Sequence, residues 1–306
     1  ESESRGLGDV YKRQELHARQ RLNLACAVNS ERIPTTFHFK QENIMKEAVI
    51  VSAARTPIGR AYRGAFNNLE SPSLSAHAIK AALEKGSIDP AEVEDCIMGA
   101  AIQQGTQSGN LGRQAAMAAG MPVSVAGMTI DRQCSSGLMT IATGAKQIVM
   151  DGAPIVVAGG CESVSLAQNE HMNTYRGLDP LTVKNAPAIH MPMLDTAEVV
   201  ANRYNISREA QDEYAVVSQA RTAAAQEAGK FDDEIVPLTA TKIVTNRDTG
   251  EVTEEEVTLS KDEGNRPGTT LAALSGLKVV RPGGTITGGN ASQLSDGAAA
   301  VVMMDS

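Results

Sequence analysis

The chain has 306 residues, and its 28 Lys and Arg against 36 Asp and Glu give a formal net charge of −8. Apolar residues make up 42% of the chain, which is too many for a disordered protein, and no apolar run is long enough to span a membrane. An acidic chain without Trp and with few aromatic residues is also a poor candidate for a nucleic-acid-binding protein, which needs a basic face or stacking surfaces.

Residues 1–44 are predicted not to belong to the folded protein. The chain begins with Glu1 and has no Met before Met45, and SRGLGDVYKRQ (Ser4–Gln14) resembles the translation of a sequencing adaptor. We interpret this segment as a non-native leader, made of adaptor and upstream read-through, and exclude it from the fold. The alternative is an organelle transit peptide, which its Arg residues favour and its five Glu oppose, because such peptides are poor in acids.

From Met45 onward, short apolar runs alternate with helical patterns. AVIVS (Ala48–Ser52) is a β-branched run typical of buried strands, and Ser135–Met150 has apolar residues at spacings of three and four, which indicates a helix. This alternation predicts an α/β fold with a mixed, mostly parallel sheet covered by helices. We expect strands at 48–52, 93–99, 126–130 and 154–158, the last ended by Gly159-Gly160, and helices at 73–84 (stopped by Gly86), 110–119 and 135–150.

The pattern changes after residue 166. Gln168–Asp195 contains three Pro and has no clear period, so it is predicted to be an ordered excursion with a functional role. Ser207 is a good N-cap and Gly229 a good stop, which together predict a long helix. Its apolar stripe is formed by Ala210, Tyr214, Val217, Ala220 and Ala224.

Strand patterns follow this helix. Short strands are expected at 234–238, 242–245 and 251–259 around a turn at 247–250. AAAVVMM (Ala298–Met304) has the composition of a buried strand and is expected to return to the first sheet. The sequence stops directly after it, which predicts a sheet edge or face left exposed.

Cys134 lies between a predicted strand and a predicted helix, in DRQCSSG (Asp131–Gly137). The free N–H groups and positive dipole end at a helix start favour the nucleophilic thiolate and can hold a developing oxyanion. The alternative is a buried structural Cys, and position alone leaves both open. The four Cys have no spacing typical of a metal site, so no metal is predicted, and they suit a reduced compartment. The other three, Cys26, Cys96 and Cys161, lack the setting of Cys134.

Five ordered segments resemble the thiolase family and cover nearly all of Met45–Ser306. Two departures from the family pattern are Cys161 in place of the usual Met and Gly288 in place of an Ala. The segments are MKEAVIVSAARTPIGR (Met45–Arg60), DRQCSSGLMTI (Asp131–Ile141), AGGCES (Ala158–Ser163), the pair TAEVVANRYNISREAQDEYAVVSQ (Thr196–Gln219) and GKFDDEIVP (Gly229–Pro237), and GTITGGNASQLSDGAAAVVMM (Gly284–Met304).

The resemblance implies a thiolase-like layered α/β fold with an inserted loop domain. Residues 45–166 would form the N-terminal domain, 167–283 the loop domain, and 284–306 the return strand of the N-terminal domain. The family's Asn-Glu-Ala-Phe, Gly-His-Pro and Cys-x-Gly segments do not occur in this sequence. We therefore expect the C-terminal half-domain to be missing, together with the His base and the second Cys, and the chain to be inactive alone.

The resemblance also implies the reaction, acyl transfer between Cys134 and coenzyme A that forms or cleaves 3-ketoacyl-CoA by a Claisen step. Arg266 and Ser292 would contact CoA, Ala291 would lie beside its pantetheine arm, and Met193 would lie near the acyl pocket. Because CoA is polyanionic and the chain acidic, binding needs locally placed basic groups. Each residue also has a purely structural alternative: Arg266 would be a solvent-exposed loop residue, Ser292 would order a turn, and Met193 would only contribute to packing.

Two other functions remain open at this stage. One is a ketoacyl-synthase-like condensing enzyme, which also places Cys at a strand–helix junction, and the other is a non-catalytic, thiolase-like CoA- or lipid-binding protein. GNASQLSDGAAA (Gly289–Ala300) favours the thiolase reading over the first, and the intact QCSSG (Gln133–Gly137) argues against the second. We expect acyl-CoA and CoA as partners, no cofactor, no nucleic acid or membrane, a homo-oligomer for the complete protein, and a cytoplasmic location.

Overall fold

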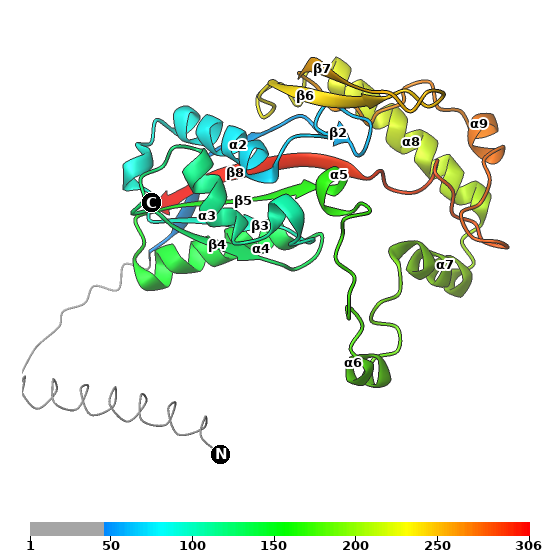
Figure 1. Cartoon of the computed structure of the whole chain (residues 1–306), viewed down its shortest axis with the longest axis horizontal. Coiled ribbons are helices and arrows are strands. Elements are labelled where there is room, and N and C mark those ends of the chain that lie inside the picture. Colours follow the sequence, from blue (N-terminus) through cyan, green and yellow to red (C-terminus); the bar gives the residue numbers. More distant parts are fainter. Residues whose placement is uncertain (1–45) are drawn as a thin grey trace, which may run out of the picture. The chain divides into compact units, whose positions relative to one another are not determined.

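A mixed sheet organises the part of the chain that the computed structural model describes, residues 46–306 (Figure 1). The strand order is β1-β8-β5-β3-β4, and the short β2 also pairs with β8. The predicted leader, 1–44, lies outside the described residues. The strands of this sheet are β1 (Ala48–Arg55), β2 (Gly59–Arg60), β3 (Asp95–Gly99), β4 (Ala126–Ile130), β5 (Ile155–Ser163) and β8 (Ser295–Asp305).

Most strands of the sheet run in one direction. β3 pairs in parallel with both β4 and β5, whereas β8 pairs antiparallel with both β5 and β1. In the order β1-β8-β5-β3-β4, β8 is therefore the reversed strand, and β1 runs parallel to β5 although they do not touch. The prediction of a mixed, mostly parallel sheet is confirmed.

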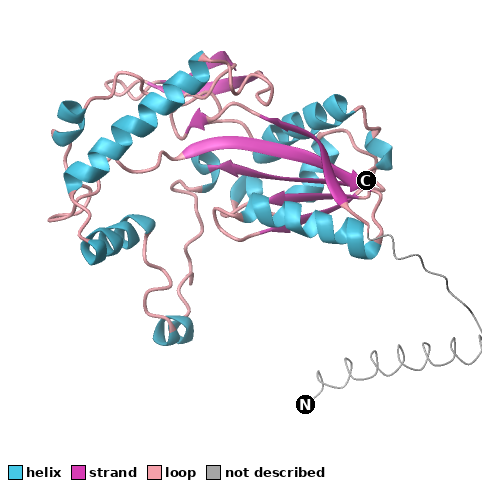
Figure 2. Cartoon of the chain, turned by 180° about the vertical axis from the view of Figure 1, so that it is seen from behind, coloured by secondary structure: helices cyan, strands magenta, loops and turns pink. Residues whose placement is uncertain are grey.

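Alternate side chains of the central strands enter two separate apolar cores. Cys96 and Met98 of β3 are buried on one face, in a core that α2 (Ser71–Gly86) and α3 (Leu111–Ala118) complete. Ile97, between them, is buried in the core on the other face, which α4 (Ser136–Lys146) and the π-helical turn Gln147–Asp151 cover. Neighbouring residues of a strand point to opposite faces, so a strand covered on both sides is apolar throughout. Figure 2 shows helices on both sides of the sheet.

Two predicted element ends are wrong for identifiable reasons. α2 ends with Ser87 in the left-handed conformation (φ 53°), one residue beyond the predicted Gly86 stop. β5 continues through Gly159-Gly160, which were expected to end it. A Cβ on Gly159 would lie 2.2 Å from the carbonyl oxygen of Ala299 in β8. Glycine is therefore present at this position because the neighbouring backbone is close.

The last strand is central in the sheet, so it is not itself an edge. The terminal strand beside it is β1, where Ile50 and Val51 are exposed. β8 lies between β1 and β5 and pairs along its length with both. Ala300, Val302 and Met303 are buried. The apolar run at 298–304 indicated a buried strand, and that part of the prediction is confirmed; its insertion between two earlier strands is a long-range pairing that local patterns do not specify.

Residues 164–294 carry smaller elements. The strand pair β6 (Leu238–Thr245) and β7 (Val252–Leu259) flanks the expected turn at 247–250, but in place of separate strands at 234–238 and 242–245 there is one strand that begins at Leu238. None of the helices described between residues 46 and 306 is long and apolar enough to cross a membrane. The helices of residues 164–294 are α5 (Val164–Ala167), α6 (Pro180–Asn185), α7 (Met193–Tyr204), α8 (Arg208–Glu227) and α9 (Leu271–Ser275). Two 3-10 turns lie earlier in the chain, η1 (Pro90–Glu92) and η2 (Gly105–Gln107).

The long helix α8 begins at the predicted N-cap, where the Ser207 hydroxyl accepts a hydrogen bond from the N–H of Ala210. Its apolar stripe is not a buried face, since Tyr214 and Val217 are exposed. The buried residue of α8 is Asp212, whose carboxylate is paired with Arg208 at 2.6 Å. The domain boundaries predicted at 166/167 and 283/284 stay predictions.

The contact at Gly159 predicts a large cost for the smallest side chain. Gly159→Ala is expected to lower the free energy of unfolding by about 1–3 kcal/mol, because β8 must move to admit the methyl group. Gly268→Ala is the matched control, since a Cβ there meets nothing within 4 Å, and it should change stability by less than about 0.5 kcal/mol. Urea unfolding measures the stability of both variants. Equal unfolding midpoints for Gly159→Ala and the control would show that β8 can move to admit the methyl group without loss of stability.

Candidate active site

Cys134 lies on a tight turn between β4 and α4. Gln133, the residue before it, has a left-handed backbone (φ 49°), which is uncommon for a residue with a side chain. The hydroxyl of Ser136 accepts a hydrogen bond from the N–H of Arg132 (2.8 Å) and donates one to the carbonyl of Gln133 (2.6 Å). Ser136 is 4% exposed, so this hydroxyl closes the turn from inside the protein. The turn leaves Cys134 exposed.

Gly99 lets the start of α4 approach the sheet closely. A Cβ on Gly99 of β3 would lie 2.6 Å from the carbonyl carbon of Ser136, and one on Gly160 of β5 would lie 3.4 Å from the Cα of Gly137. No larger residue at Gly99 would allow the helix to stay where it is. This contact fixes the position of Cys134 relative to the ends of β3 and β5.

The backbone around Cys134 offers hydrogen-bond donors. Cys134 directly precedes the N-cap of α4, Ser135, and Gly137 lies in the first turn of the helix, where backbone N–H groups have no acceptor within the helix itself. Both residues line a cavity of about 500 Å³. Unpaired N–H groups at the first turn of a helix, facing a cavity, can hold a negatively charged oxygen.

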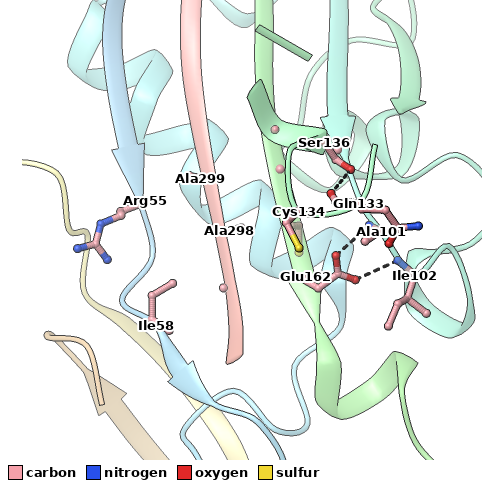
Figure 3. Close-up of a pocket in the computed structure, with 15 residues that line it drawn as sticks. Arg55, Ile58, Ala101, Ile102, Gln133, Cys134, Ser136, Glu162, Ala298 and Ala299 are labelled. Atoms are coloured by element: carbon pink, nitrogen blue, oxygen red, sulfur yellow. Dashed lines mark hydrogen bonds between the residues drawn. The ribbon is translucent and has the colours of Figure 1, made fainter. Parts of the chain in front are cut away.

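This cavity, which we call the thiol cavity, lies at one end of the parallel strands (Figure 3). β1, β3 and β5 bring their carboxyl ends to it, and β8 brings its opposite end, which is the usual place for a site in a sheet of this kind. Its wall is mostly small or apolar. The lining residues are Arg55, Ile58, Gly99, Ala101, Ile102, Gln133, Cys134, Ser136, Gly137, Gly160, Cys161, Glu162, Gly297, Ala298 and Ala299.

The two charged residues at the thiol cavity are already engaged. The Glu162 carboxylate accepts hydrogen bonds from the N–H groups of Ala101 (2.9 Å) and Ile102 (3.2 Å), as Figure 3 shows, and from the side-chain amide of Gln107 (2.6 Å). It thereby holds one wall of the cavity. Arg55 is bound through Nε to Glu234 (2.8 Å) and through both terminal nitrogens to Asp262 (2.8 and 3.1 Å).

The motifs did not predict the positioning roles of Glu162 and Ser136. Glu162 belongs to the segment AGGCES and Ser136 to DRQCSSG, and neither segment by itself indicates these hydrogen bonds. A general signal was present for Ser136, because a hydroxyl at the start of a helix often bonds the local backbone. No sequence signal identifies the partners of Glu162, which lie about 55–61 residues away in the chain.

Cys134 differs from the other described thiols. Burial raises the pKa of Cys96 to about 12, and burial likewise raises the pKa of Cys161 to about 12. Both are therefore protonated at neutral pH and shielded from solvent. Cys161 lines the thiol cavity, but its Sγ lies 3.7 Å from the carbonyl of Ser71, on the α2 side of the sheet. Among residues 46–306, Cys134 is thus the accessible thiol.

The predicted CoA contacts fall into two adjoining cavities. Arg266 and Ala291 line one of about 370 Å³, and Ser292 lines another of about 280 Å³. Gln219 and Gln293 line both, and Ile58 lines both the smaller one and the thiol cavity. The three cavities therefore form a connected series. Met193 lies apart from them, at the first position of α7 with 73% of its surface exposed.

Buried or bonded carboxylates hold the loop that carries Ala291 and Ser292. Glu198 of α7 accepts from the N–H groups of Thr285 (2.8 Å) and Ile286 (2.9 Å), and the Ile286 hydrogen bond is the main reason that the pKa of Glu198 is lowered. Asp212 of α8 accepts from the side-chain amide of Asn290 (3.0 Å). The loop is therefore fixed by α7 and α8.

No group of three or more His, Cys, Asp or Glu within residues 46–306 could hold a metal ion.

Comparisons with known proteins agree with this architecture. The family model described as "Thiolase, N-terminal domain" matches residues 48–306. The chain is 41% identical to the 3-ketoacyl-CoA thiolase of Bacillus subtilis over 262 residues, and 42% identical to the acetyl-CoA acetyltransferase of Cupriavidus necator over 273 residues. In both cases the match covers 85% of this chain and 66% of the relative.

Two solved structures are similar over the same region. The acetyl-CoA acetyltransferase of Bacillus anthracis superposes with a TM-score of 0.73 at 39% identity, covering 86% of this chain and 66% of the other. The human mitochondrial 3-ketoacyl-CoA thiolase in complex with CoA superposes with a TM-score of 0.70 at 36% identity, covering 85% and 65%. The chain thus spans just under two thirds of the length of these relatives.

The Ser136 hydroxyl predicts a measurable role for the turn. Ser136→Ala leaves the N–H of Arg132 and the carbonyl of Gln133 without this partner, so we expect a loss of about 1–3 kcal/mol in the free energy of unfolding. Thr143→Ala, which removes a hydroxyl bonded to the Met139 carbonyl within the same helix, should change stability by less than about 0.5 kcal/mol. Urea unfolding measures both, and a Ser136→Ala variant as stable as the control would contradict this role.

Proposed function

The chain belongs to the thiolase family, and on this basis we propose that it carries the nucleophile of an acyltransferase acting on coenzyme A thioesters. Cys134 would take up an acyl group as a thioester and exchange it with CoA, forming or cleaving a 3-ketoacyl-CoA by a Claisen or retro-Claisen step. The names of its relatives, 3-ketoacyl-CoA thiolase and acetyl-CoA acetyltransferase, favour this over a ketoacyl-synthase-like condensing enzyme or a non-catalytic CoA- or lipid-binding protein.

The observation that carries the proposal is the setting of Cys134. Its thiol is exposed at the start of α4, in a cavity walled by small and apolar groups, while Cys96 and Cys161 are buried. A thiolate at a helix N-terminus is a stabilised nucleophile. The N–H groups of Cys134 and Gly137, at the start of α4 and in the lining of the cavity, would supply donors for the oxyanion of a tetrahedral intermediate, whose charge develops as the acyl carbonyl is attacked.

The adjoining cavities suit the rest of CoA. Arg266 offers a guanidinium for a phosphate, and Ala291 and Ser292 line the space between it and the thiol cavity. Ile58, Gln219 and Gln293, which the cavities share, mark a route between Arg266 and Cys134. An extended CoA would lie along this route with its thiol toward Cys134. The exposed position of Met193 gives no support to its predicted place near the acyl group.

The thiol cavity lacks a group to move protons. No His is among the residues that line it, and the Glu162 carboxylate is occupied by three donors. Thiolysis and condensation both need a proton removed from a thiol or from the α-carbon. The 306-residue chain would therefore react at Cys134 without completing a catalytic cycle.

Three further proposals concern the location of the protein in the cell, its need for a cofactor and its oligomeric state. A reactive Cys134 thiol needs a reducing environment, which favours the cytoplasm, although three of the relatives are named as peroxisomal. The chemistry needs no cofactor, because CoA itself is the substrate. β4 pairs on one side only, with β3, and this unpaired edge favours assembly into a homo-oligomer.

Alkylation tests the nucleophile. Iodoacetamide at neutral pH is expected to modify Cys134 at least about tenfold faster than Cys96 or Cys161, because only the thiolate of an accessible Cys reacts quickly. Peptide mass spectrometry over a time course gives the rate at each Cys, and Cys134→Ser provides the blank. Equal rates at Cys134 and Cys96 in the folded chain would remove the basis of the proposal.

Turnover is expected to be absent from this chain. The purified 306-residue protein, mixed with acetoacetyl-CoA and CoA, should show no loss of absorbance at the 3-ketoacyl-CoA band above the Cys134→Ser variant. Intact-mass measurement after incubation with acetyl-CoA reports separately whether an acetyl group is transferred to Cys134. Cys134-dependent thiolysis would falsify the claim that the described residues lack a usable base.

A further inference from the structure

A fourth cavity lies away from the thiol cavity and from the predicted CoA contacts. Its volume is about 440 Å³, within the range of about 300–1,000 Å³ typical of small-molecule sites. Two segments form it, the turn around Tyr62–Asn67 that follows β2 and the end of β6 with its turn. It shares no lining residue with the three cavities described above. We call it the β6 cavity.

Three cations line the β6 cavity, and no acid does. Arg63 comes from the first segment, and Lys242 and Arg247 come from the second. Within residues 46–306 none of the three forms an ion pair or donates a side-chain hydrogen bond. Glu255 lies opposite Lys242 in the β6–β7 ladder, but the two do not form an ion pair. Asp248 follows Arg247 in the turn but does not line the cavity, so the charged side chains of the lining itself are all cations.

The two segments are fixed relative to each other by one side chain. The amide of Asn67 donates to the carbonyl of Ile243 (2.8 Å) and accepts from its N–H (2.9 Å), while also donating to the carbonyl of Tyr62 (3.1 Å). Tyr62 is itself anchored, because its N–H donates to the hydroxyl of Ser165 (2.6 Å). The frame of the cavity is therefore in place without a ligand.

The edge of β6 contributes a backbone donor. Asn246 donates its N–H to the carbonyl of Glu251 across the hairpin. In an antiparallel pair every second residue bonds the partner strand, so the next residues of β6 that bond β7 through their backbone are Val244 and Lys242. By the same alternation, Ile243 and Thr245 direct their N–H and C=O groups to the free edge. Those of Ile243 are taken by Asn67, whereas Thr245 lines the cavity. An N–H beside cations that form no ion pair completes an anion-binding arrangement.

We propose that the β6 cavity binds a phosphate-bearing small molecule, at a site separate from the one predicted for CoA. Two guanidinium groups favour phosphate oxygens, to which Arg bonds in a bidentate manner. The cavity is larger than one phosphate requires, so it accommodates a diphosphate or a phosphate with an organic group attached. The proposal does not depend on the chemistry of Cys134.

Calorimetric titration of the 306-residue chain with inorganic pyrophosphate, and then with ADP, tests the site. The variant Arg63→Gln/Lys242→Gln/Arg247→Gln removes the three cations. Lys184→Gln/Arg203→Gln/Lys230→Gln is the matched control, because it makes the same change of net charge at exposed positions that line none of the four cavities. Arg266→Gln removes the cation predicted to contact CoA, and adenosine without phosphate is the ligand control.

We expect pyrophosphate and ADP to bind at least about tenfold more weakly to the cavity variant, and less than twofold more weakly to the charge-matched control. Arg266→Gln should leave this site intact, and adenosine should not bind. Equally weakened binding of pyrophosphate in both triple variants would show an effect of net charge alone and overturn the proposal. Unchanged binding in the cavity variant would also overturn it, as would loss of all binding in Arg266→Gln.

A second measurement keeps the test decisive if the triple variant is unstable. In the unmodified chain, titration with pyrophosphate should shift the amide resonance of Thr245 more than that of Thr253, which lies on the neighbouring strand. A Thr245 amide that does not move at saturation would also overturn the proposal. The alkylation rate of Cys134 reports independently on the thiol cavity, so failure of one proposal is distinguishable from failure of the other.

Discussion

The approach of the α4 backbone to Gly99 and Gly160 is the contact on which the thiol cavity depends. It brings the first turn of a helix against the ends of β3 and β5 at a distance that a Cβ on Gly99 would prevent. The turn before the helix must then reverse sharply, and Gln133 adopts a left-handed backbone to do so. The Ser136 hydroxyl stabilises that reversal. Cys134 is exposed at one fixed place because these three features coincide.

Carboxylates in this fold act mainly as acceptors for the loops that surround the cavities. Each accepts hydrogen bonds from backbone N–H groups that no strand or helix would otherwise satisfy. The acidic composition of the chain therefore has a local structural use, and it leaves the cavities without a free acid. The clearest cases are Glu162 with Ala101 and Ile102, Asp262 with Ile58, Glu263 with Arg60 and Ala65, Glu198 with Thr285 and Ile286, and Asp296 with Ser165.

Local patterns predicted the elements well and their assembly less well. The strand at 126–130 and the α8 N-cap at Ser207 follow from period and capping, whereas the position of Cys134 at a strand–helix junction left open whether its thiol is exposed or buried. The central place of β8 and the passage of β5 through Gly159-Gly160 depend on residues more than 100 positions away. Arg266 and Ala291 line one cavity and Ser292 lines the adjoining one, while Met193 is exposed at the start of α7; the roles predicted for these four residues stay predictions.

The contact between Asn67 and Ile243 has a consequence for the solubility of the protein. β6 is an outer strand of a two-stranded sheet, and such strands can recruit further strands from other molecules. By taking up both backbone groups of Ile243, the Asn67 amide imitates one residue of a neighbouring strand and then stops, because it has no backbone to continue the ladder. A single side chain thus interrupts a surface that would otherwise favour aggregation.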